Sequence, residues 1–389
     1  LQSETAWCLT NIATNKRGVS SILELSGSLE LAGRVLMESN FPAVREQMAW
    51  FIGNLGGHDL VSRQRLRDVP DVVGGLTHCI RGSRTICILK NSLWAASNMI
   101  FGNPEADMEK VRDVLLSFTQ TLDTAMQDKI VETQIRDSIV ELVFQGLKGG
   151  MFSNPEAVEF VGLSSGFISR VMSVVRHARN IGHIDLITTG MRCLGLTAKG
   201  SEELKQALIN NNYLTQAVAL LQYGNERVSK EVCMGLADLV AKTDSNRLQK
   251  FSRTRNLFPT LISVANNESW MVKKPAYAVI FNYLTAGNHD RHKDFINHGG
   301  MQVLCDSIKI TKDVDAGTCA HGLEAIIRLL RVDQVNKRKL RVATLIDEHG
   351  GLQIIEELVN AVKDTVFNRA VFITEEYFNS NDENMADNY

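Results

Sequence analysis

One pair of side chains, a tryptophan with an asparagine four residues later, occurs three times in the first hundred residues. The pairs are Trp7–Asn11, Trp50–Asn54 and Trp94–Asn98, and their tryptophans lie 43 and 44 residues apart. An indole face attracts the stem and charge of Lys or Arg with roughly 0.5–2 kcal/mol. An asparagine amide carries both a donor and an acceptor, so it can pair with an extended peptide backbone. These residue types suit the binding of a basic peptide.

Helical geometry places each tryptophan and its asparagine on one face, because residues four apart are neighbours on a helix. The residues two and five positions after each tryptophan fall on the opposite face. They are aliphatic and predict the core stripe: Leu9 and Ile12, Ile52 and Leu55, and Ala96 and Met99. Glu4 and Glu46 lie on or near the tryptophan face, where carboxylates favour cationic ligands. The pattern therefore predicts a binding surface rather than core packing.

The elements that position these pairs are repeated helices. Their spacing falls in the window of roughly 40–47 residues that is typical of armadillo and HEAT repeats. Two near-copies, 296–304 and 347–355, read as a helix end, a Gly-Gly turn and a new helix, with weaker copies at Gly27, Gly74 and Gly166. The 389 residues are too long for one ordinary core, but repeats pack only on their neighbours. We predict an all-α, armadillo-repeat, right-handed superhelical solenoid.

The boundaries follow from the same periodicity. We expect the solenoid to span residues 1–378, with about eight full repeats after a truncated first one. Residue 1 falls inside a helical pattern, so we expect the chain to lack its natural start. Residues 379–389 are polar and acidic, and they predict a disordered tail.

Net charge, cysteine spacing and the absence of catalytic motifs limit the classes of function that this sequence predicts. A net charge of −2 gives no sign of a nucleic-acid partner, and no run approaches the roughly 20 apolar residues that span a membrane. The seven cysteines lack CxxC spacing, which favours free core thiols in the cytosol or nucleus. No P-loop, GxSxG or HExxH motif is present, so we predict no enzyme, no metal and no cofactor. His289 and His292 have HxxH spacing, but we interpret that segment as a solvated turn.

Three stretches resemble the Trp/Asn-bearing third helices of repeats two to four of the importin-α family: 4–13, 44–57 and 91–98. Residues 350–379 resemble its tenth repeat. The resemblance implies a nuclear import adaptor whose major site for nuclear localisation signals consists of the three Trp/Asn pairs, and it implies that Gln47 contacts a lysine. It also implies importin-β as a partner through a basic segment outside this sequence, an export receptor at the C-terminal repeats, and residence in cytoplasm and nucleus.

The deepest lysine pocket of the family is only partly matched. Asn15 and Ser20 stand where the family has Gly and Thr, and His58 stands where it has Asp. Asp59 follows directly. Two alternatives remain: the pocket is weakened, or Asp59 replaces the missing carboxylate.

The second, minor site departs further from the family. Its ladder positions are expected at Val140, Arg192, Met234 and Ala278, followed four residues later by Phe144, Leu196, Asp238 and Asn282. The family itself carries Arg at the second position, and the broken spacing indicates an insertion of about ten residues between Met151 and Ile187. We keep Arg192, Asp238 and Asn282 as candidate minor-site residues and expect bipartite signals to gain little.

Two other functions fit the residues of this face less well. An armadillo scaffold for adhesion or signalling typically lines its groove with Lys and Arg to hold acidic partners, whereas this face shows Trp, Asn and carboxylates. An enzyme on an α-solenoid needs converging His, Asp or Cys residues, which the face does not show. The basic run 337–341 is interpreted as a solvated inter-helix loop, with a signal mimic or a partner contact as the alternative.

Overall fold

The computed structural model describes residues 2–102, 107–127, 133–152, 154–241, 245–267, 269–360 and 365–378. Within these ranges the regular secondary structure is helical throughout, so the all-α prediction is confirmed. The predicted acidic tail, 379–389, lies outside the described residues. The chain divides into two compact units, Leu1–Asn211 and Asn212–Tyr389.

The helices of the first unit are α1 (Gln2–Ile12), α2 (Lys16–Glu24), α3 (Ser28–Glu38), α4 (Pro42–His58), α5 (Leu60–Asp68), α6 (Pro70–Gly82), α7 (Ile86–Ile100), α8 (Met108–Gln127), α9 (Thr133–Phe152), α10 (Pro155–Gly162), α11 (Phe167–Ile181), α12 (Ile184–Thr197) and α13 (Glu202–Asn210). Those of the second unit are α14 (Tyr213–Leu221), α15 (Glu226–Val240), α16 (Ser245–Arg253), α17 (Leu257–Asn267), α18 (Trp270–Ala286), α19 (His289–Asn297), α20 (Gly300–Thr311), α21 (Ala316–Val335), α22 (Val342–Glu348), α23 (Gly351–Val359), α24 (Thr365–Ile373) and a π-helical turn, η1 (Thr374–Phe378).

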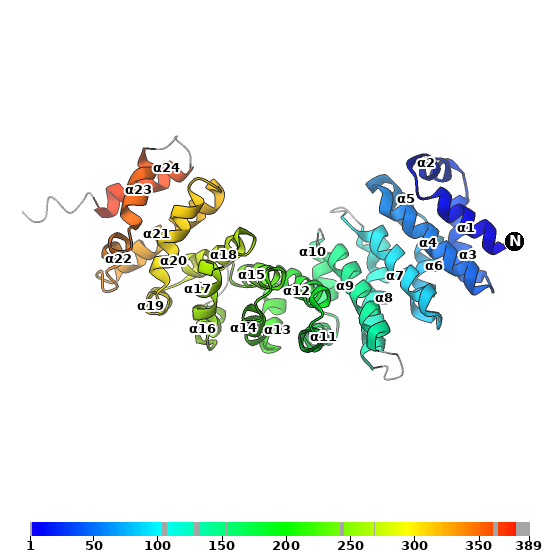
Figure 1. The fold of residues 1–389 in the computed structure, drawn as a ribbon, viewed down its shortest axis with the longest axis horizontal. Coiled ribbons are helices and arrows are strands. Elements are labelled where there is room, and N and C mark those ends of the chain that lie inside the picture. Colours follow the sequence, from blue (N-terminus) through cyan, green and yellow to red (C-terminus); the bar gives the residue numbers. More distant parts are fainter. Residues whose placement is uncertain are drawn as a thin grey trace, which may run out of the picture. The chain divides into compact units, whose positions relative to one another are not determined.

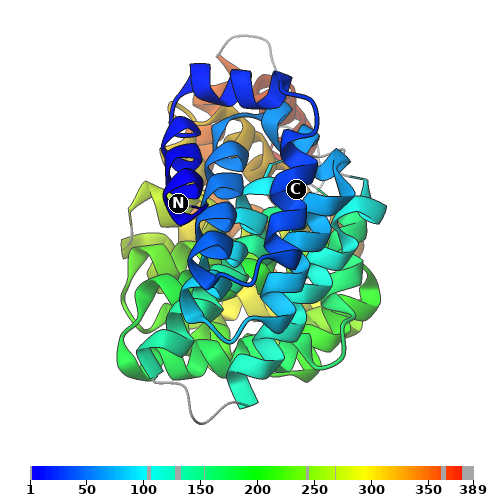
Figure 2. The same ribbon diagram turned by 90° about the vertical axis from the view of Figure 1, so that its right-hand side faces the viewer.

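Within each unit, most helices fall into groups of three, and each group stacks on the next (Figure 1 and Figure 2). Within the first unit the third helices, α1, α4, α7, α9 and α12, form a row, and within the second unit α15, α18, α21 and α24 form a row. The second helices form a further row within each unit: α3, α6, α8 and α11 in the first, and α14, α17, α20 and α23 in the second. Each group therefore buries its apolar faces against its neighbours, as a repeat protein does.

A left-handed residue marks the entry to the second helix of most groups. Glycine adopts this conformation without a steric penalty, and asparagine tolerates it better than most residues. The φ angle lies between 63° and 78° at all six positions: Gly27, Gly166, Asn212, Asn256, Gly299 and Gly350.

The junction expected at Gly74 is wrong, because α6 runs through it without a break. The neighbouring Gly75 contributes to helix packing rather than to a turn. A Cβ there would lie 2.6 Å from the carbonyl oxygen of Gly33 and 2.9 Å from the Cβ of Leu36, so glycine allows α3 and α6 to approach closely.

The predicted core stripe is confirmed in α4 and α7, where Ile52, Leu55, Ala96 and Met99 are fully buried. It is wrong in α1, where Leu9 is half-buried and Ile12 is 45% exposed. The helix that packs on α1 is α4, and the buried α1 positions are Ala6 and Thr10 instead.

Five of the seven cysteines are buried, and Cys8 and Cys87 are exposed. In the part of the chain that the structure describes, no single helix has the length and apolar character to cross a membrane; α10 and α11 meet that test only as a pair bent by 82°.

Candidate functional site

Three neighbouring third helices of the first unit, α1, α4 and α7, carry the predicted tryptophan and asparagine residues. We call these side chains the Trp/Asn ladder: Trp7, Asn11, Trp50, Asn54, Trp94 and Asn98. Trp7 is 58% exposed and Trp50 is 45% exposed, although both are large apolar groups. The structure therefore places two of the three indoles on an open surface, as the helical pattern predicts.

The third indole, Trp94, is half-buried because it packs on the backbone of α4. A Cβ added to Gly53 would lie 2.1 Å from Cζ3 and 2.4 Å from Cε3 of the Trp94 ring, closer than any real contact. The absence of a side chain at Gly53 therefore creates the space that the ring occupies.

The ladder asparagines also tie neighbouring helices together. Nδ2 of Asn54 donates to the carbonyl oxygen of Thr10 at 3.0 Å, and Nδ2 of Asn98 donates to that of Gly53 at 3.0 Å. In each case the acceptor is the residue just before the ladder asparagine of the preceding helix. Asn11 instead donates to the carbonyl of Trp7 within its own helix, at 3.0 Å.

These bonds fix which way each amide points. A carbonyl only accepts, so Nδ2 must face it, and Oδ1 with the second N–H is directed elsewhere. An amide held this way needs little ordering when a peptide backbone arrives, which favours binding. The geometry can thus supply paired donors and acceptors beside slots for aliphatic stems.

A second row of polar groups lies three residues before each tryptophan: Glu4, Gln47 and Asn91. All three end in oxygen acceptors, which suit an ammonium or guanidinium group. Gln47 is half-buried, and among the described residues its Oε1 atom is a buried acceptor without a hydrogen-bond partner. The sequence interpretation missed Asn91, although its position relative to Trp94 was the available signal.

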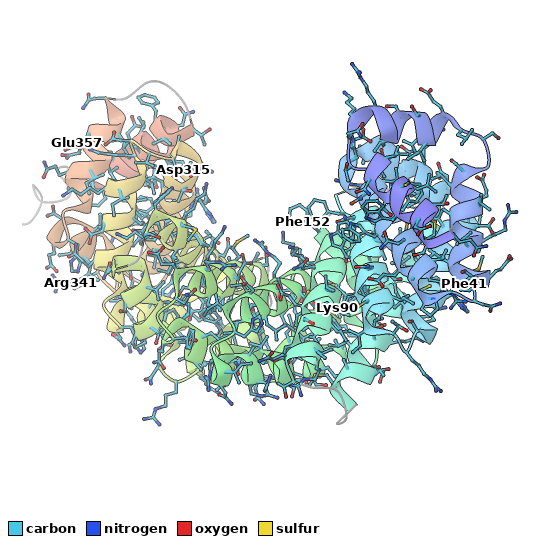
Figure 3. All side chains as sticks on the ribbon, turned by 45° about the vertical axis from the view of Figure 1, so that its right-hand side comes forward. Phe41, Lys90, Phe152, Asp315, Arg341 and Glu357 are labelled. Carbon is cyan, nitrogen blue, oxygen red and sulfur yellow. The ribbon has the colours of Figure 1, made fainter. Side chains whose placement is uncertain are left out.

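The charge on this face is mixed. Glu46, four residues before Trp50, is half-buried, and Lys90 takes the corresponding place before Trp94 (Figure 3). A cation there opposes a cationic ligand in the third slot. The sequence interpretation missed this residue, which the periodicity alone identifies.

The carboxylate of Asp59 is engaged by contacts within the chain. Its Oδ1 accepts hydrogen bonds from the backbone N and Oγ of Ser62, both at 2.8 Å, and so caps the N-terminus of α5. Its Oδ2 lies 3.3 Å from Nδ1 of His58. The Ser62 backbone and side-chain bonds lower the pKa of Asp59, so it stays anionic in the cap. These contacts argue against Asp59 turning to replace the missing carboxylate.

The remaining predicted major-site residues lie on or next to α2. Asn15 caps this helix, with Oδ1 accepting from the backbone N of Gly18 at 2.9 Å. Ser20 is exposed on the same helix.

The minor-site interpretation needs correction in α9. Val140 and Phe144 are buried at 1% and 0% exposure, so neither can contact a peptide. The half-exposed pair four residues apart is Glu141 and Gln145, joined by a 3.3 Å hydrogen bond from Nε2 to Oε1. Glu141 lies 47 residues after Trp94, so the 43- and 44-residue spacing of the tryptophans does not continue into this helix.

The other minor-site candidates belong to different units. Arg192 is half-buried on α12 in the first unit, and Leu196 beside it is buried. In the second unit, Asp238 and Asn282 are half-buried on α15 and α18. Nδ2 of Asn282 donates to the carbonyl of Ala237 at 3.0 Å, which repeats the contact that Asn54 and Asn98 make in the ladder.

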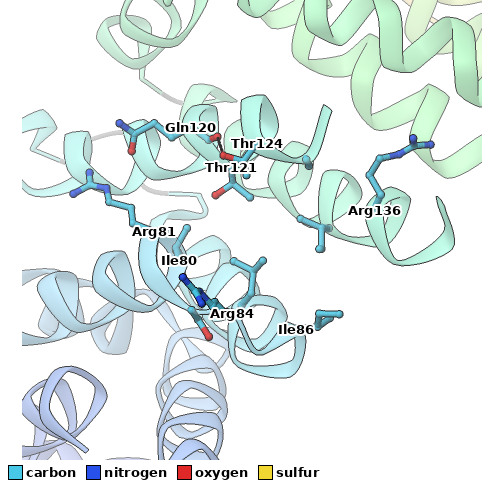
Figure 4. Close-up of a pocket in the computed structure, with 12 residues that line it drawn as sticks. Ile80, Arg81, Arg84, Ile86, Gln120, Thr121, Thr124 and Arg136 are labelled. Atoms are coloured by element: carbon cyan, nitrogen blue, oxygen red, sulfur yellow. Dashed lines mark hydrogen bonds between the residues drawn. The ribbon is translucent and has the colours of Figure 1, made fainter. Parts of the chain in front are cut away.

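A cavity of about 520 Å³ lies apart from the ladder, among α6, α7, α8 and α9 (Figure 4). Arg81, Arg84 and Arg136 line it together with apolar side chains such as Ile80 and Ile139. Arg136 and Arg81 pair with Asp137 and Asp113 at 3.1 and 3.7 Å, and among the described residues the lining of the cavity itself holds cations and no carboxylate, which disfavours a lysine-rich ligand there.

Both histidines of the HxxH segment, His289 and His292, lie on α19. Within the described ranges, no group of three or more His, Cys, Asp or Glu side chains is placed to hold a metal ion. The solvated-turn interpretation is nevertheless wrong for His292, which is fully buried in α19 with Nε2 2.8 Å from the carbonyl oxygen of Leu284.

The chain is similar in sequence to known proteins with helical repeats. Residues 341–389 match the model of the atypical Arm repeat. The chain is 26% identical to importin subunit alpha-1b of Oryza sativa subsp. japonica over 388 residues, 97% of this chain and 68% of that protein. It is 23% identical to importin subunit alpha-8 of Arabidopsis thaliana, over 95% of this chain and 79% of that protein.

Solved structures share the fold. An engineered protein from the Northeast Structural Genomics Consortium superposes with a TM-score of 0.68 at 14% identity, over 96% of this chain and 94% of that one. A designed armadillo repeat protein in complex with peptide (KR)4 superposes with a TM-score of 0.56 at 18% identity, over 66% of this chain and 99% of that one. The predicted armadillo solenoid is confirmed.

These relatives, together with the fold, support a nuclear import adaptor or an armadillo scaffold. Importin-α relatives match nearly the whole chain, at identities of 23–26% where the match is that long. The chain is therefore similar to importin-α proteins over nearly its whole length.

Proposed function

We propose that this chain binds lysine- and arginine-rich nuclear localisation signals along the Trp/Asn ladder and acts as a nuclear import adaptor. The observation that carries the proposal is the oriented amides of Asn54 and Asn98 beside exposed or half-exposed indoles. The amides would hold the backbone of an extended peptide, and the indoles would hold the stems of its cationic side chains.

The row of acceptors before the tryptophans supports a cationic ligand. The buried Oε1 of Gln47 lacks a partner among the described residues, which is unfavourable unless a donor arrives. A designed armadillo repeat protein of the same fold is in complex with the peptide (KR)4, which is the chemistry that the ladder would bind here.

The proposal sets the partners. Cargo proteins with basic signals would occupy the ladder, and importin-β would engage a basic segment outside residues 1–389. An export receptor at the C-terminal repeats would return the chain, which would place it in both cytoplasm and nucleus. With Val140, Phe144 and Leu196 buried, the minor site would add little to the binding of a bipartite signal.

The alternative is an armadillo scaffold for another protein partner. Lys90 is the observation that favours it, because a lysine on the ladder face suits an acidic ligand.

A binding titration tests the proposal. A labelled peptide with a Lys-Lys-Lys-Arg-Lys core is titrated with the chain, and fluorescence anisotropy is followed. We expect micromolar or tighter binding, which Trp50→Ala combined with Asn54→Ala abolishes. Trp270→Ala is the matched control, because this indole lies outside the ladder, with its ring centroid 6.5 Å from that of Tyr277. Absence of binding by the folded wild-type chain, or undiminished binding by the double variant, would refute the proposal.

A further inference from the structure

Four cations gather in the short connection between α21 and α22. They are Lys337, Arg338, Lys339 and Arg341, and we call them the basic turn. All four side chains are exposed. The turn belongs to the second unit, whereas the Trp/Asn ladder belongs to the first.

The backbone of the basic turn is strained. Lys337, Arg338 and Arg341 adopt φ angles of 59°, 54° and 51°, in the left-handed region that disfavours residues with a Cβ. Every other described residue with positive φ is a glycine or an asparagine. Strain of this kind persists where the surrounding structure enforces it, and it concentrates at binding sites.

A buried carboxylate enforces the strained conformation. Asp333, 3% exposed, accepts from the backbone N of Leu340 at Oδ1 (2.8 Å) and from that of Val342 at Oδ2 (2.9 Å). Its carbonyl oxygen accepts from the backbone N of Arg338 at 2.7 Å. Both carboxylate oxygens are thus engaged with the backbone, and the turn is held in one shape.

The side chains of the turn have few internal partners. Arg341 lies 3.8 Å from Glu348, and both side chains are more than half exposed. In the described part of the chain, no carboxylate pairs with Lys337, Arg338 or Lys339. The fold therefore presents these cations to the surroundings without neutralising them.

A cavity of about 150 Å³ adjoins the turn, and Arg338 and Arg341 both line it, together with Tyr377 and with Asp333, whose two carboxylate oxygens are already engaged by the backbone N–H groups of the turn. Its size suits one short side chain. Arg341 projects from the surface of this unit (Figure 3). A carboxylate between two guanidinium groups would make charge-assisted hydrogen bonds, the strongest kind available to such a ligand.

We propose that the basic turn is a docking site for an acidic peptide segment of a partner protein. One Asp or Glu side chain of that segment enters the cavity between Arg338 and Arg341, and its neighbours face Lys337 and Lys339. A short peptide fits better than nucleic acid, because the cations occupy one compact turn and the chain as a whole carries a net charge of −2.

The test uses the full chain and a fluorescein-labelled hexaglutamate peptide, with binding followed by anisotropy at low salt. Arg338→Gly combined with Arg341→Gly is the informative variant, because glycine relieves the strain while it removes the charge. We expect at least tenfold weaker peptide binding together with a higher midpoint of thermal unfolding. Lys293→Ala combined with Lys309→Ala removes two exposed cations elsewhere in this unit and should leave binding within twofold.

Two results would overturn the inference. One is unchanged hexaglutamate binding by the glycine variant, which would assign these residues a structural role only. The other is equal competition by a single-stranded hexanucleotide, which would favour a nucleic-acid partner. Binding of the Lys-Lys-Lys-Arg-Lys peptide by the same variant should stay unchanged, so failure here is distinguishable from failure of the proposed function.

Discussion

Substitution of Gly53 by alanine should damage the Trp/Asn ladder without removing any of its side chains. The new Cβ would lie 2.1 Å from Cζ3, 2.4 Å from Cε3 and 3.0 Å from Cη2 of Trp94. The indole must therefore leave its position on α4. The carbonyl of Gly53, which accepts from Asn98 at 3.0 Å, stays in place because the backbone of a helix accommodates alanine.

The magnitude follows from opposing terms. Alanine in place of glycine within a helix ordinarily stabilises by about 1 kcal/mol. Overpacking against a ring usually costs about 1–3 kcal/mol, so the net change in unfolding free energy should be a loss of up to about 2 kcal/mol. Displacement of the indole removes a cation–π contact of roughly 0.5–2 kcal/mol. Affinity for the Lys-Lys-Lys-Arg-Lys peptide should accordingly fall about 2–30-fold.

The assay pairs two glycine variants. Gly74→Ala also lies within a helix, but its nearest contact would be Sδ of Met37 at 3.8 Å, an ordinary distance. We expect that variant to be more stable by about 1 kcal/mol and to bind the peptide as the wild type does. Urea unfolding and anisotropy are measured for both. If Gly53→Ala gained stability like Gly74→Ala and bound normally, the argument that Gly53 positions Trp94 would fail.

Four further predictions test other parts of the argument. Lys90→Gln should tighten basic-peptide binding about 2–5-fold at low salt, because a like charge worth roughly 0.5–1 kcal/mol is removed; no change would place Lys90 outside the site. Asp59→Ser should retain both the helix cap and normal peptide affinity, whereas Asp59→Ala should lose about 1 kcal/mol of unfolding free energy; weaker binding by Asp59→Ser would make Asp59 a lysine ligand. Burial lowers the pKa of His292 in the folded chain to about 4. Between about pH 6.5 and pH 4 the unfolded chain therefore binds a proton at this residue and the folded chain does not, so the free energy of unfolding decreases as the pH falls. Urea unfolding should show about 2 kcal/mol less stability at pH 5 than at pH 7, with a smaller difference in His292→Gln. A bipartite signal should bind less than tenfold more tightly than a monopartite one, and a larger preference in anisotropy would restore the minor site.

The parts of the site that depend on helical periodicity could be predicted from the sequence. Trp50 and Asn54 share a face because they are four residues apart, and Ile52 and Leu55 fall on the opposite side. The packing of the Trp94 ring against Gly53 could not be predicted, because Gly53 lies on another helix, 41 residues earlier in the chain. The two residues meet only when α4 packs on α7.

The errors have related causes. Val140 was expected on the open face, but it lies 46 residues after Trp94 rather than 43 or 44, and α8 and α9 are each 20 residues long, longer than the helices before them. His292 was expected in a turn at a helix junction, whereas it lies within α19 and is completely buried. The left-handed entries at Asn212 and Asn256 were missed because only glycine was sought there.

The bond from Asn282 to Ala237 has a practical consequence for protein engineering. The amide already has the anchored orientation of the ladder asparagines, yet the residue four positions earlier is Ala278, which is half-buried on the same helix. Ala278→Trp would thus place an indole beside an asparagine amide that is already oriented to bind a peptide backbone. This single substitution would create one Trp/Asn pair in the second unit. Peptide-binding Trp/Asn pairs could therefore be added to this protein one at a time by substitution, without redesign of its helices.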